Sequence, residues 1–200
     1  NCLLYSLEIT IAEAYRLQTD HFNANKYFDL AARRKDLIQA FCWNEVVGFF
    51  VDYNFIERKQ APALTLAGLF PLFVKISQQE QADLVAINVR DQFLQPGGVV
   101  TTLRKTGQQW DAPNGWAPLQ WVTITGLENY DHQDLAKQIA VRWIKLNRDV
   151  FKRTGKLMEK YNVVDTQLEA GGGEYAGQDG FGWTNGVLLA LIEREKLSEH

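Results

Sequence analysis

The sequence predicts an all-α protein, and three observations support this prediction. Apolar residues recur at intervals of three and four in about seven segments, as they do along one face of a helix. Few segments alternate between apolar and polar residues as half-buried strands do. The connectors alternate between short and long, and 200 residues are enough for one domain but hardly for two.

Two helices joined by a short connector are predicted at the start of the chain. Over residues 3–18, and again over residues 24–41, apolar side chains repeat with the helical period. The connector from Gln18 to His21 is short, so the two helices are expected to lie antiparallel as a hairpin. Residues 48–55 are rich in aromatic residues without helical spacing, and we expect them to be extended.

Two further helices are predicted in the middle of the chain. Residues 64–76 form a short one, and Pro71 within it is expected to break or kink it. Residues 79–93 form the next helix. It stops before the strong breaker Gln95-Pro96-Gly97-Gly98.

Three helices are predicted in the second half of the chain. Residues 117–129 form the first, in which a proline near the first turn is acceptable. Residues 134–152 follow the helical period more closely than any other segment. Residues 184–196 form the last helix, with Thr184 as its expected N-cap.

Two long loops, residues 96–116 and 162–183, lie between these helices. Long loops in a compact domain are usually functional or disordered, and the large aromatic residues in these two argue against disorder. Several helical hairpins with long functional loops at one end are typical of part of an α/α toroid. The aromatic residues concerned are Trp110, Trp116, Tyr175, Phe181 and Trp183.

Composition excludes several functional classes. Lys and Arg number 21 against 24 Asp and Glu, and the net charge of −3 leaves no electrostatic footprint for nucleic acid. No apolar run approaches the roughly 20 residues that a membrane span requires. Two cysteines and three scattered histidines provide neither a disulfide framework nor the ligand spacing of a metal site. We therefore expect no nucleic-acid partner, no membrane and no metal.

The first long loop carries candidates for sugar binding. Six tryptophans in 200 residues exceed twofold the roughly 1.3% of ordinary proteins, and flat aromatic faces suit sugar rings. Pro113 and Pro118 stiffen this loop, and Gly115 allows a sharp turn. The same tryptophans would also serve as core anchors that close helix ends, and the residues alone do not decide between the two roles. The candidates are Trp110, Asp111, Asn114 and Trp116.

The second loop is dominated by glycine. Residues 171–186 contain seven glycines in sixteen positions, but no lysine and no preceding strand, so the segment is not a phosphate-binding P-loop. Glycines beside an acidic residue indicate that the backbone passes close to a ligand. The alternative interpretation of this segment is a flexible linker. The polar and aromatic candidates here are Glu174, Gln178, Asp179 and Trp183.

Other candidates for catalysis are few. The long helix is expected to end at residues 156–162, which places Glu159 near a helix end that faces the second loop. A carboxylate at this place serves either as a general base or as a solvated surface group. The histidines support no Ser/His/Asp triad, and Cys42 is interpreted as a small buried thiol rather than a nucleophile.

Three motifs together resemble the trehalases, the inverting glycosidases that split α,α-trehalose into two glucose molecules. Residues 109–118 (QWDAPNGWAP) resemble the second signature of that family. The glycine-rich residues 171–175 (GGGEY) and 178–186 (QDGFGWTNG) resemble it as well. The motif at 159–161 (EKY) begins fifteen residues before Glu174, as in bacterial-type members. The resemblance covers essentially all 200 residues, as the C-terminal part of a longer enzyme.

The resemblance implies a six-hairpin (α/α)6 toroid, no cofactor, and hydrolysis of a small disaccharide with inversion. It places the general base at Glu159 and a sugar-contacting carboxylate at Glu174, which is also the competing candidate for the base. The family's first signature, its arginine clamps and its acid, an aspartate, are expected upstream of Asn1. Asp111 is an acidic residue in the right kind of loop, but it matches the second signature and not the motif of the catalytic acid.

We therefore expect residues 1–200 to be a single segment, the C-terminal part of a trehalase-like catalytic domain whose N-terminal part is absent. The segment alone is expected to be inactive and to expose apolar helix faces that the rest of the protein would cover. Two alternatives stay open, namely an inverting α-toroid glycosidase acting on another glucoside and a non-catalytic sugar-binding module. The composition fits the cytoplasm and the periplasm equally.

Overall fold

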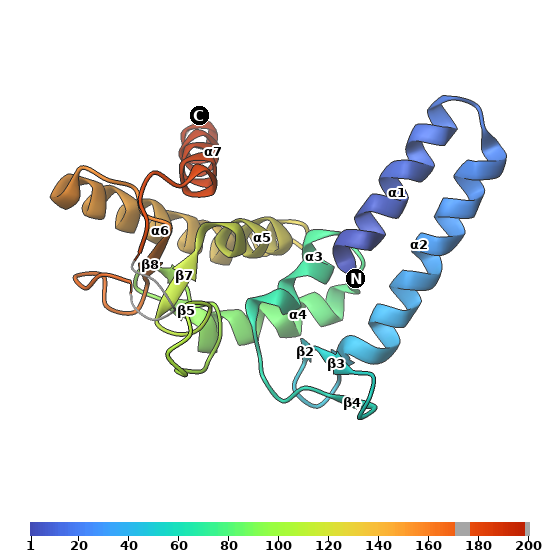
Figure 1. Ribbon diagram of the computed structural model, residues 1–200, viewed down its shortest axis with the longest axis horizontal. Coiled ribbons are helices and arrows are strands. Elements are labelled where there is room, and N and C mark those ends of the chain that lie inside the picture. The colour runs from blue at the N-terminus through green and yellow to red at the C-terminus, as the bar shows by residue number, and fades with distance from the viewer. Residues whose placement is uncertain (171–176, 199–200) are drawn as a thin grey trace.

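The computed structural model describes residues 1–170 and 177–198 and begins with a long helical hairpin (Figure 1). Its two helices are α1 (Cys2–Leu17) and α2 (His21–Cys42). Asp20 caps α2, because its carboxylate accepts a hydrogen bond from the backbone N–H of Asn23 at 3.1 Å. Both predicted helices and the short connector between them are confirmed.

Side-chain pairs fix the antiparallel register of this hairpin. The Arg34 guanidinium donates two hydrogen bonds to the Glu8 carboxylate, at 2.9 and 2.6 Å. Nearer the connector, the rings of Tyr15 and Tyr27 stack with centroids 5.9 Å apart. These pairs lie on facing sides of α1 and α2, which confirms the predicted hairpin.

The predicted helices in the middle of the chain are present but divided. The segment expected at 64–76 is a 3₁₀ turn followed by one α-helical turn, and Pro71 lies in that turn, where its missing N–H costs nothing. The segment expected at 79–93 begins as an α-helix and ends as a π-helical turn. These elements are η1 (Leu66–Leu69), α3 (Phe70–Phe73), α4 (Gln79–Asn88) and η2 (Val89–Phe93).

The second half contains α5 (Ala117–Glu128), α6 (Gln133–Thr154) and α7 (Gly182–Ser198). α5 and α6 pack together, and α7 packs on both of them. Arg194 of α7 lies 4.1 Å from the centroid of the Trp121 ring on α5. The three predicted helices are confirmed.

Two predictions in this half are wrong. Thr184 is not an N-cap, since it lies within α7, and its hydroxyl donates to the backbone carbonyl of Met158 at 2.8 Å. Residues 156–162 are not the end of the long helix. α6 ends at Thr154 because Gly155 adopts a left-handed conformation with φ of 71°, after which the chain is extended.

Short strands form antiparallel pairs between the helices of the described residues. Three of the pairs connect neighbouring parts of the chain, and the predicted extended segment at 48–55 contributes to two of them. The fourth joins the two long loops and positions the site. The pairs are β1 (Trp43–Asn44) with β2 (Phe49–Phe50), β3 (Tyr53–Asn54) with β4 (Lys59–Gln60), β5 (Leu94–Gln95) with β6 (Gly98–Val99), and β7 (Asn114–Trp116) with β8 (Lys160–Asn162).

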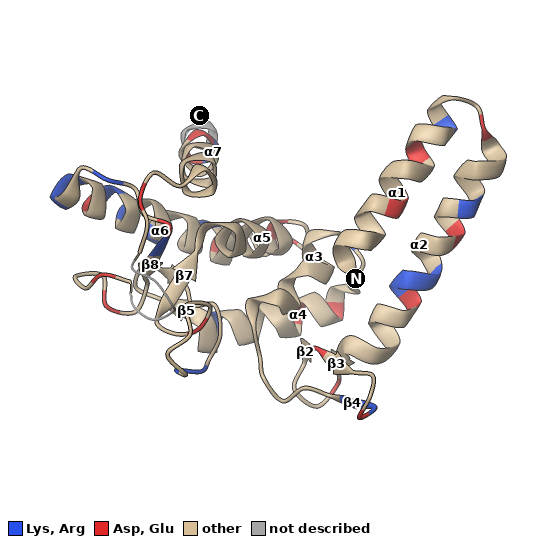
Figure 2. Ribbon diagram, in the orientation of Figure 1, with Lys and Arg blue, Asp and Glu red and all other residues tan. Residues whose placement is uncertain are grey.

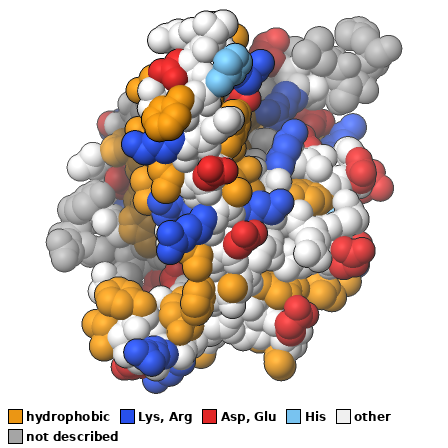
Figure 3. Space-filling view, turned by 90° about the vertical axis from the view of Figure 1, so that its right-hand side faces the viewer, with side chains coloured by type: hydrophobic (Ala, Val, Ile, Leu, Met, Phe, Trp, Pro, Cys, Tyr) orange, Lys and Arg blue, Asp and Glu red, His pale blue; other side chains and the backbone are white. Residues whose placement is uncertain are grey.

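The first hairpin exposes many apolar side chains, as expected from the sequence. Acidic and basic residues intermingle along it (Figure 2), and Figure 3, which looks onto this side, shows hydrophobic side chains between them. None of the described helices combines the length and hydrophobicity needed to cross a membrane. The exposed apolar residues of α1 and α2 are Leu3, Leu4, Leu7, Leu17, Phe22, Leu30, Leu37 and Phe41.

Candidate functional site

The pairing of β7 with β8 brings the two long loops together. Gly115 lies opposite Tyr161, and Trp116 lies opposite Lys160. At Gly115 a Cβ atom would lie 2.4 Å from Cγ1 of Val163, so this position accepts no side chain without displacing its neighbour. The first loop therefore lies directly against the segment that carries Glu159.

Glu159 directly precedes β8 and is buried. Its backbone N–H donates to the carbonyl of Gln178 at 2.8 Å, and its own carbonyl accepts from Nε1 of Trp183 at 3.3 Å. The adjacent carbonyl of Met158 accepts from the Thr184 hydroxyl at 2.8 Å. The second loop and the first turn of α7 thus hold the backbone of Glu159 in place.

The carboxylate of Glu159 is paired with Lys160. The distance from Lys160 Nζ to Glu159 Oε2 is 3.3 Å, and both side chains are almost fully buried. The same Nζ lies 3.4 Å from Oε1 of Gln109 and 5.5 Å from the centroid of the Trp116 ring. Burial opposes ionisation of a carboxyl group, whereas a nearby cation favours it. The pair therefore places a carboxyl group beside a cation in a sheltered position, a setting that suits a general base.

Four aromatic rings lie beside this pair. Trp110 and Trp116 stack nearly parallel, with centroids 3.9 Å apart. The ring of Trp183 meets that of Trp116 edge-on at 5.7 Å, and Phe181 lies 4.9 Å from Trp183. Trp116 is 1% exposed, and its Nε1 donates to the Gln109 carbonyl at 2.9 Å, whereas Trp110 is 42% exposed. Trp116 is a core anchor, whereas much of the Trp110 ring is exposed.

Two polar candidates of the first loop hold its shape. The buried carboxylate of Asp111 accepts hydrogen bonds from the backbone N–H and the hydroxyl of Thr106. Nδ2 of the buried Asn114 donates to the Gln109 carbonyl at 3.1 Å. These hydrogen bonds stabilise the conformation of the loop, and the role of both residues in ligand binding stays a prediction.

The candidates of the second loop are placed differently. Gln178 is exposed and binds Glu159 through its backbone. Asp179 is exposed and forms an ion pair with Lys156. Glu174 lies outside the described residues. The structure thus brings Glu159, Gln178 and Trp183 together. All three are far from the first loop in the sequence.

The comparisons with known proteins identify the family. The Trehalase family model matches residues 1–195. The chain is 46% identical over 193 residues to the periplasmic trehalases of Citrobacter koseri and Salmonella newport, covering 96% of this chain and 34% of theirs. The chain belongs to the trehalase family. It spans about a third of the length of these relatives.

Solved structures confirm the fold of this trehalase-family chain. The neutral trehalase of Saccharomyces cerevisiae superposes with a TM-score of 0.81 at 24% identity, covering 96% of this chain and 36% of that one. A GH63 mannosylglycerate hydrolase from Thermus thermophilus gives a TM-score of 0.70 at 20% identity, covering 96% and 44%. The chain is therefore part of an (α/α)6 toroid, as predicted.

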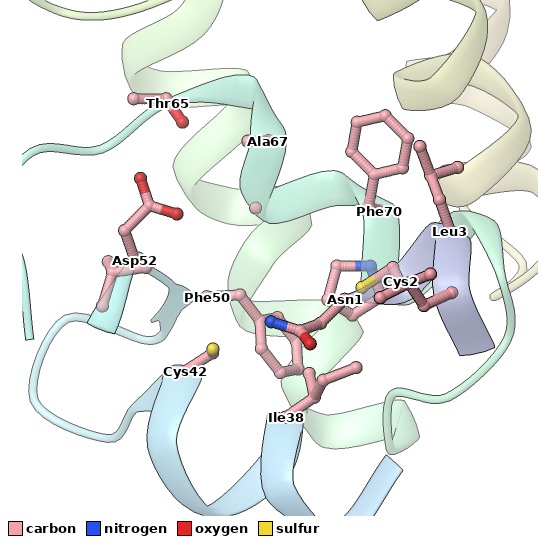
Figure 4. A pocket seen from close by; sticks show the side chains of 14 residues that line it. Asn1, Cys2, Leu3, Ile38, Cys42, Phe50, Asp52, Thr65, Ala67 and Phe70 are labelled. Carbon is pink, nitrogen blue, oxygen red and sulfur yellow. The ribbon is translucent and has the colours of Figure 1, made fainter. Parts of the chain in front are cut away.

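A pocket of about 260 Å³ lies near Asn1 and is lined by none of the residues just described (Figure 4). Cys2 and Cys42 both border it. Burial raises the pKa of the Cys2 thiol to about 11 and also raises that of Cys42. Thiols of this kind stay protonated at neutral pH, in agreement with the interpretation that Cys42 is not a nucleophile. Within the described residues, no three His, Cys, Asp or Glu side chains cluster as metal ligands.

Two residues that contact the candidate site of this trehalase-family chain are missed by sequence reasoning. Lys160 belongs to one of the motifs but has no predicted role, because nothing in its sequence context shows that it is buried. Gln109 accepts hydrogen bonds from Asn114 and Trp116 through its carbonyl and contacts Lys160 through its side chain. Its place directly before Trp110 in the family motif is the one available signal.

Proposed function

We propose that the full-length protein hydrolyses α,α-trehalose to two glucose molecules with inversion, with Glu159 as general base. The observation that supports this most is the buried, cation-paired carboxylate of Glu159 beside the partly exposed ring of Trp110. The named function of the relatives, periplasmic trehalase, points to the same substrate.

Inversion requires two carboxyl groups about 6.5–9.5 Å apart on opposite faces of the glycosidic bond. Glu159 would accept a proton from the attacking water as the water oxygen bonds to the anomeric carbon. A second carboxyl group would protonate the departing glycosidic oxygen. That acid is expected on the part of the protein upstream of these 200 residues. The chain would then be the C-terminal part of the catalytic domain, and it would be inactive alone.

Trp110 would bind one glucose ring by stacking, since its exposed face is flat and is held from behind by Trp116. Trp183 would close the edge of the same aromatic group. Glu174 is proposed as a sugar-contacting carboxylate on the strength of its motif alone.

The deciding experiment measures glucose release from α,α-trehalose by the longest natural chain that contains this sequence, with maltose and sucrose as controls. Glu159→Gln should lower kcat by about 10²–10⁴-fold or more, while substrate binding changes little. Glu13→Gln, which removes an exposed carboxylate on α1, is the matched control and should leave turnover unchanged.

The other outcomes would point elsewhere. Turnover by Glu159→Gln within about tenfold of wild type would exclude Glu159 as the base. Release from another disaccharide alone would favour a glucosidase of different specificity. Saturable binding without hydrolysis would favour a non-catalytic sugar-binding module.

A further inference from the structure

We infer that Lys160 is a positioning residue, which holds the Glu159 carboxylate in place through a buried ion pair. The inference rests on the proposed role of Glu159 as a base. It starts from one contact, the 3.3 Å distance between Lys160 Nζ and Glu159 Oε2. The two side chains are only 1% and 3% exposed, so bulk water screens this pair very little.

A buried carboxylate needs compensation before it can act as a base. Removal from water favours the protonated form, which cannot accept a proton from the attacking water. A cation within about 4–6 Å shifts the balance back toward the ionised form. The Lys160 ammonium lies well inside that range of Glu159, and the two residues are neighbours in the chain, so the cation moves with the base.

The lysine is itself fixed by the first loop. Its Nζ lies 3.4 Å from Oε1 of Gln109 and 5.5 Å from the centroid of the Trp116 ring. The backbones of Lys160 and Trp116 are opposite one another in the β7–β8 pair. Lys160 therefore connects the tryptophan-bearing loop to the Glu159 carboxylate. A shift of this loop would be transmitted through Lys160 to the carboxylate.

Four other charged groups described on these segments have partners of their own or are exposed. The Asp111 carboxylate is bound by Thr106, and Asp179 is paired with Lys156. Arg104 and Lys105 lie at exposed positions of the first loop. Lys160, by contrast, forms a buried ion pair with Glu159.

The first test uses Lys160→Met in the full-length protein and follows kcat/KM for trehalose against pH. The acidic limb of this profile reports ionisation of the base in the free enzyme. Without the cation the limb should move to higher pH. Activity should recover at alkaline pH, and KM should change little. Lys160→Arg should retain most of the wild-type limb, and Lys145→Met, which removes an exposed lysine on α6, should behave as wild type.

A second measurement covers the case in which Lys160→Met folds poorly. Removing one member of a buried ion pair leaves the other charge uncompensated, whereas removing both does not. The melting temperature of Glu159→Gln/Lys160→Met should therefore exceed that of Lys160→Met alone. If Lys160 contributed only packing, Lys160→Met would lower the melting temperature equally in the wild type and in Glu159→Gln.

The two proposals fail in different ways. A full-length wild type that releases no glucose overturns the proposed function. An active wild type whose Lys160→Met variant keeps its acidic limb, together with no coupling in the melting temperatures, overturns the role of Lys160 and leaves the proposed function standing.

Discussion

Gly115→Ala is expected to damage the site through the backbone rather than through any catalytic group. A Cβ atom at this position would lie 2.4 Å from Val163 Cγ1 and 3.0 Å from both Gln120 Nε2 and the Val99 carbonyl. Ordinary contact begins near 3.4 Å, so the segment that carries Val163 must move by about 1 Å. That segment continues β8, which directly follows Glu159.

The magnitude follows from this displacement. Overpacking of a filled interior costs about 1–3 kcal/mol of unfolding free energy. A shift of about 1 Å in a catalytic group can cost about 100-fold in rate. We therefore expect kcat/KM of the full-length Gly115→Ala protein to fall by about two orders of magnitude, with a lower melting temperature.

Two further variants separate the effect of the clash with Val163 from a general loss of stability. Val163→Ala removes the clashing Cγ1, so Gly115→Ala/Val163→Ala should recover part of the rate. Gly126→Ala is the matched control, because its Cβ would meet Leu72 Cβ and the Phe73 nitrogen at 3.2 Å, away from β7 and β8. It should lower stability slightly and leave kcat unchanged. Gly115→Ala with wild-type rate and melting temperature would refute the reasoning.

Three further predictions concern other parts of the chain. Trp110→Ala should raise KM for trehalose by up to about 10-fold with a smaller change in kcat, since it removes the exposed stacking face. Burial raises the pKa of Tyr161 from 10.0 to about 12. The stability that the neutral phenol contributes below pH 10 should therefore decline toward pH 12. Tyr161→Phe should flatten this decline in melting curves recorded at alkaline pH. Hydrogen bonds from Arg34 lower the pKa of Glu8 below 4.5, so Glu8→Gln should cost about 0.5–1 kcal/mol at pH 7 and progressively less as the pH falls below 4.5, as melting curves at several pH values would show.

The helices are predictable because their apolar period is strong. α6 is the clearest case, since Ile139, Trp143, Leu146 and Val150 are all buried on one face. Its end is harder to predict because an apolar residue, Leu157, continues the pattern beyond it, although Gly155 is available as a stop signal.

The two roles of the tryptophans cannot be separated from sequence. Trp110 and Trp116 lie in one motif and differ only in what packs on them, which depends on Trp183 and Lys160 from distant parts of the chain. Trp116 is buried as a core anchor, whereas Trp110 is exposed and its role as a sugar-binding platform stays a prediction. Tertiary contact decides between them, not residue type.

The burial of Glu159 is a property of several segments acting together. A glutamate after a long helix is typical of a surface group, because carboxylates are rarely buried unless they are paired. Here β7 covers one side, Gln178 and Trp183 hold the backbone, and Lys160 compensates the charge. These contacts meet at one place because β7 and β8 bring the first loop against the segment that carries Glu159. The two family motifs therefore form one structural unit, and a substitution in either should be felt at the carboxylate.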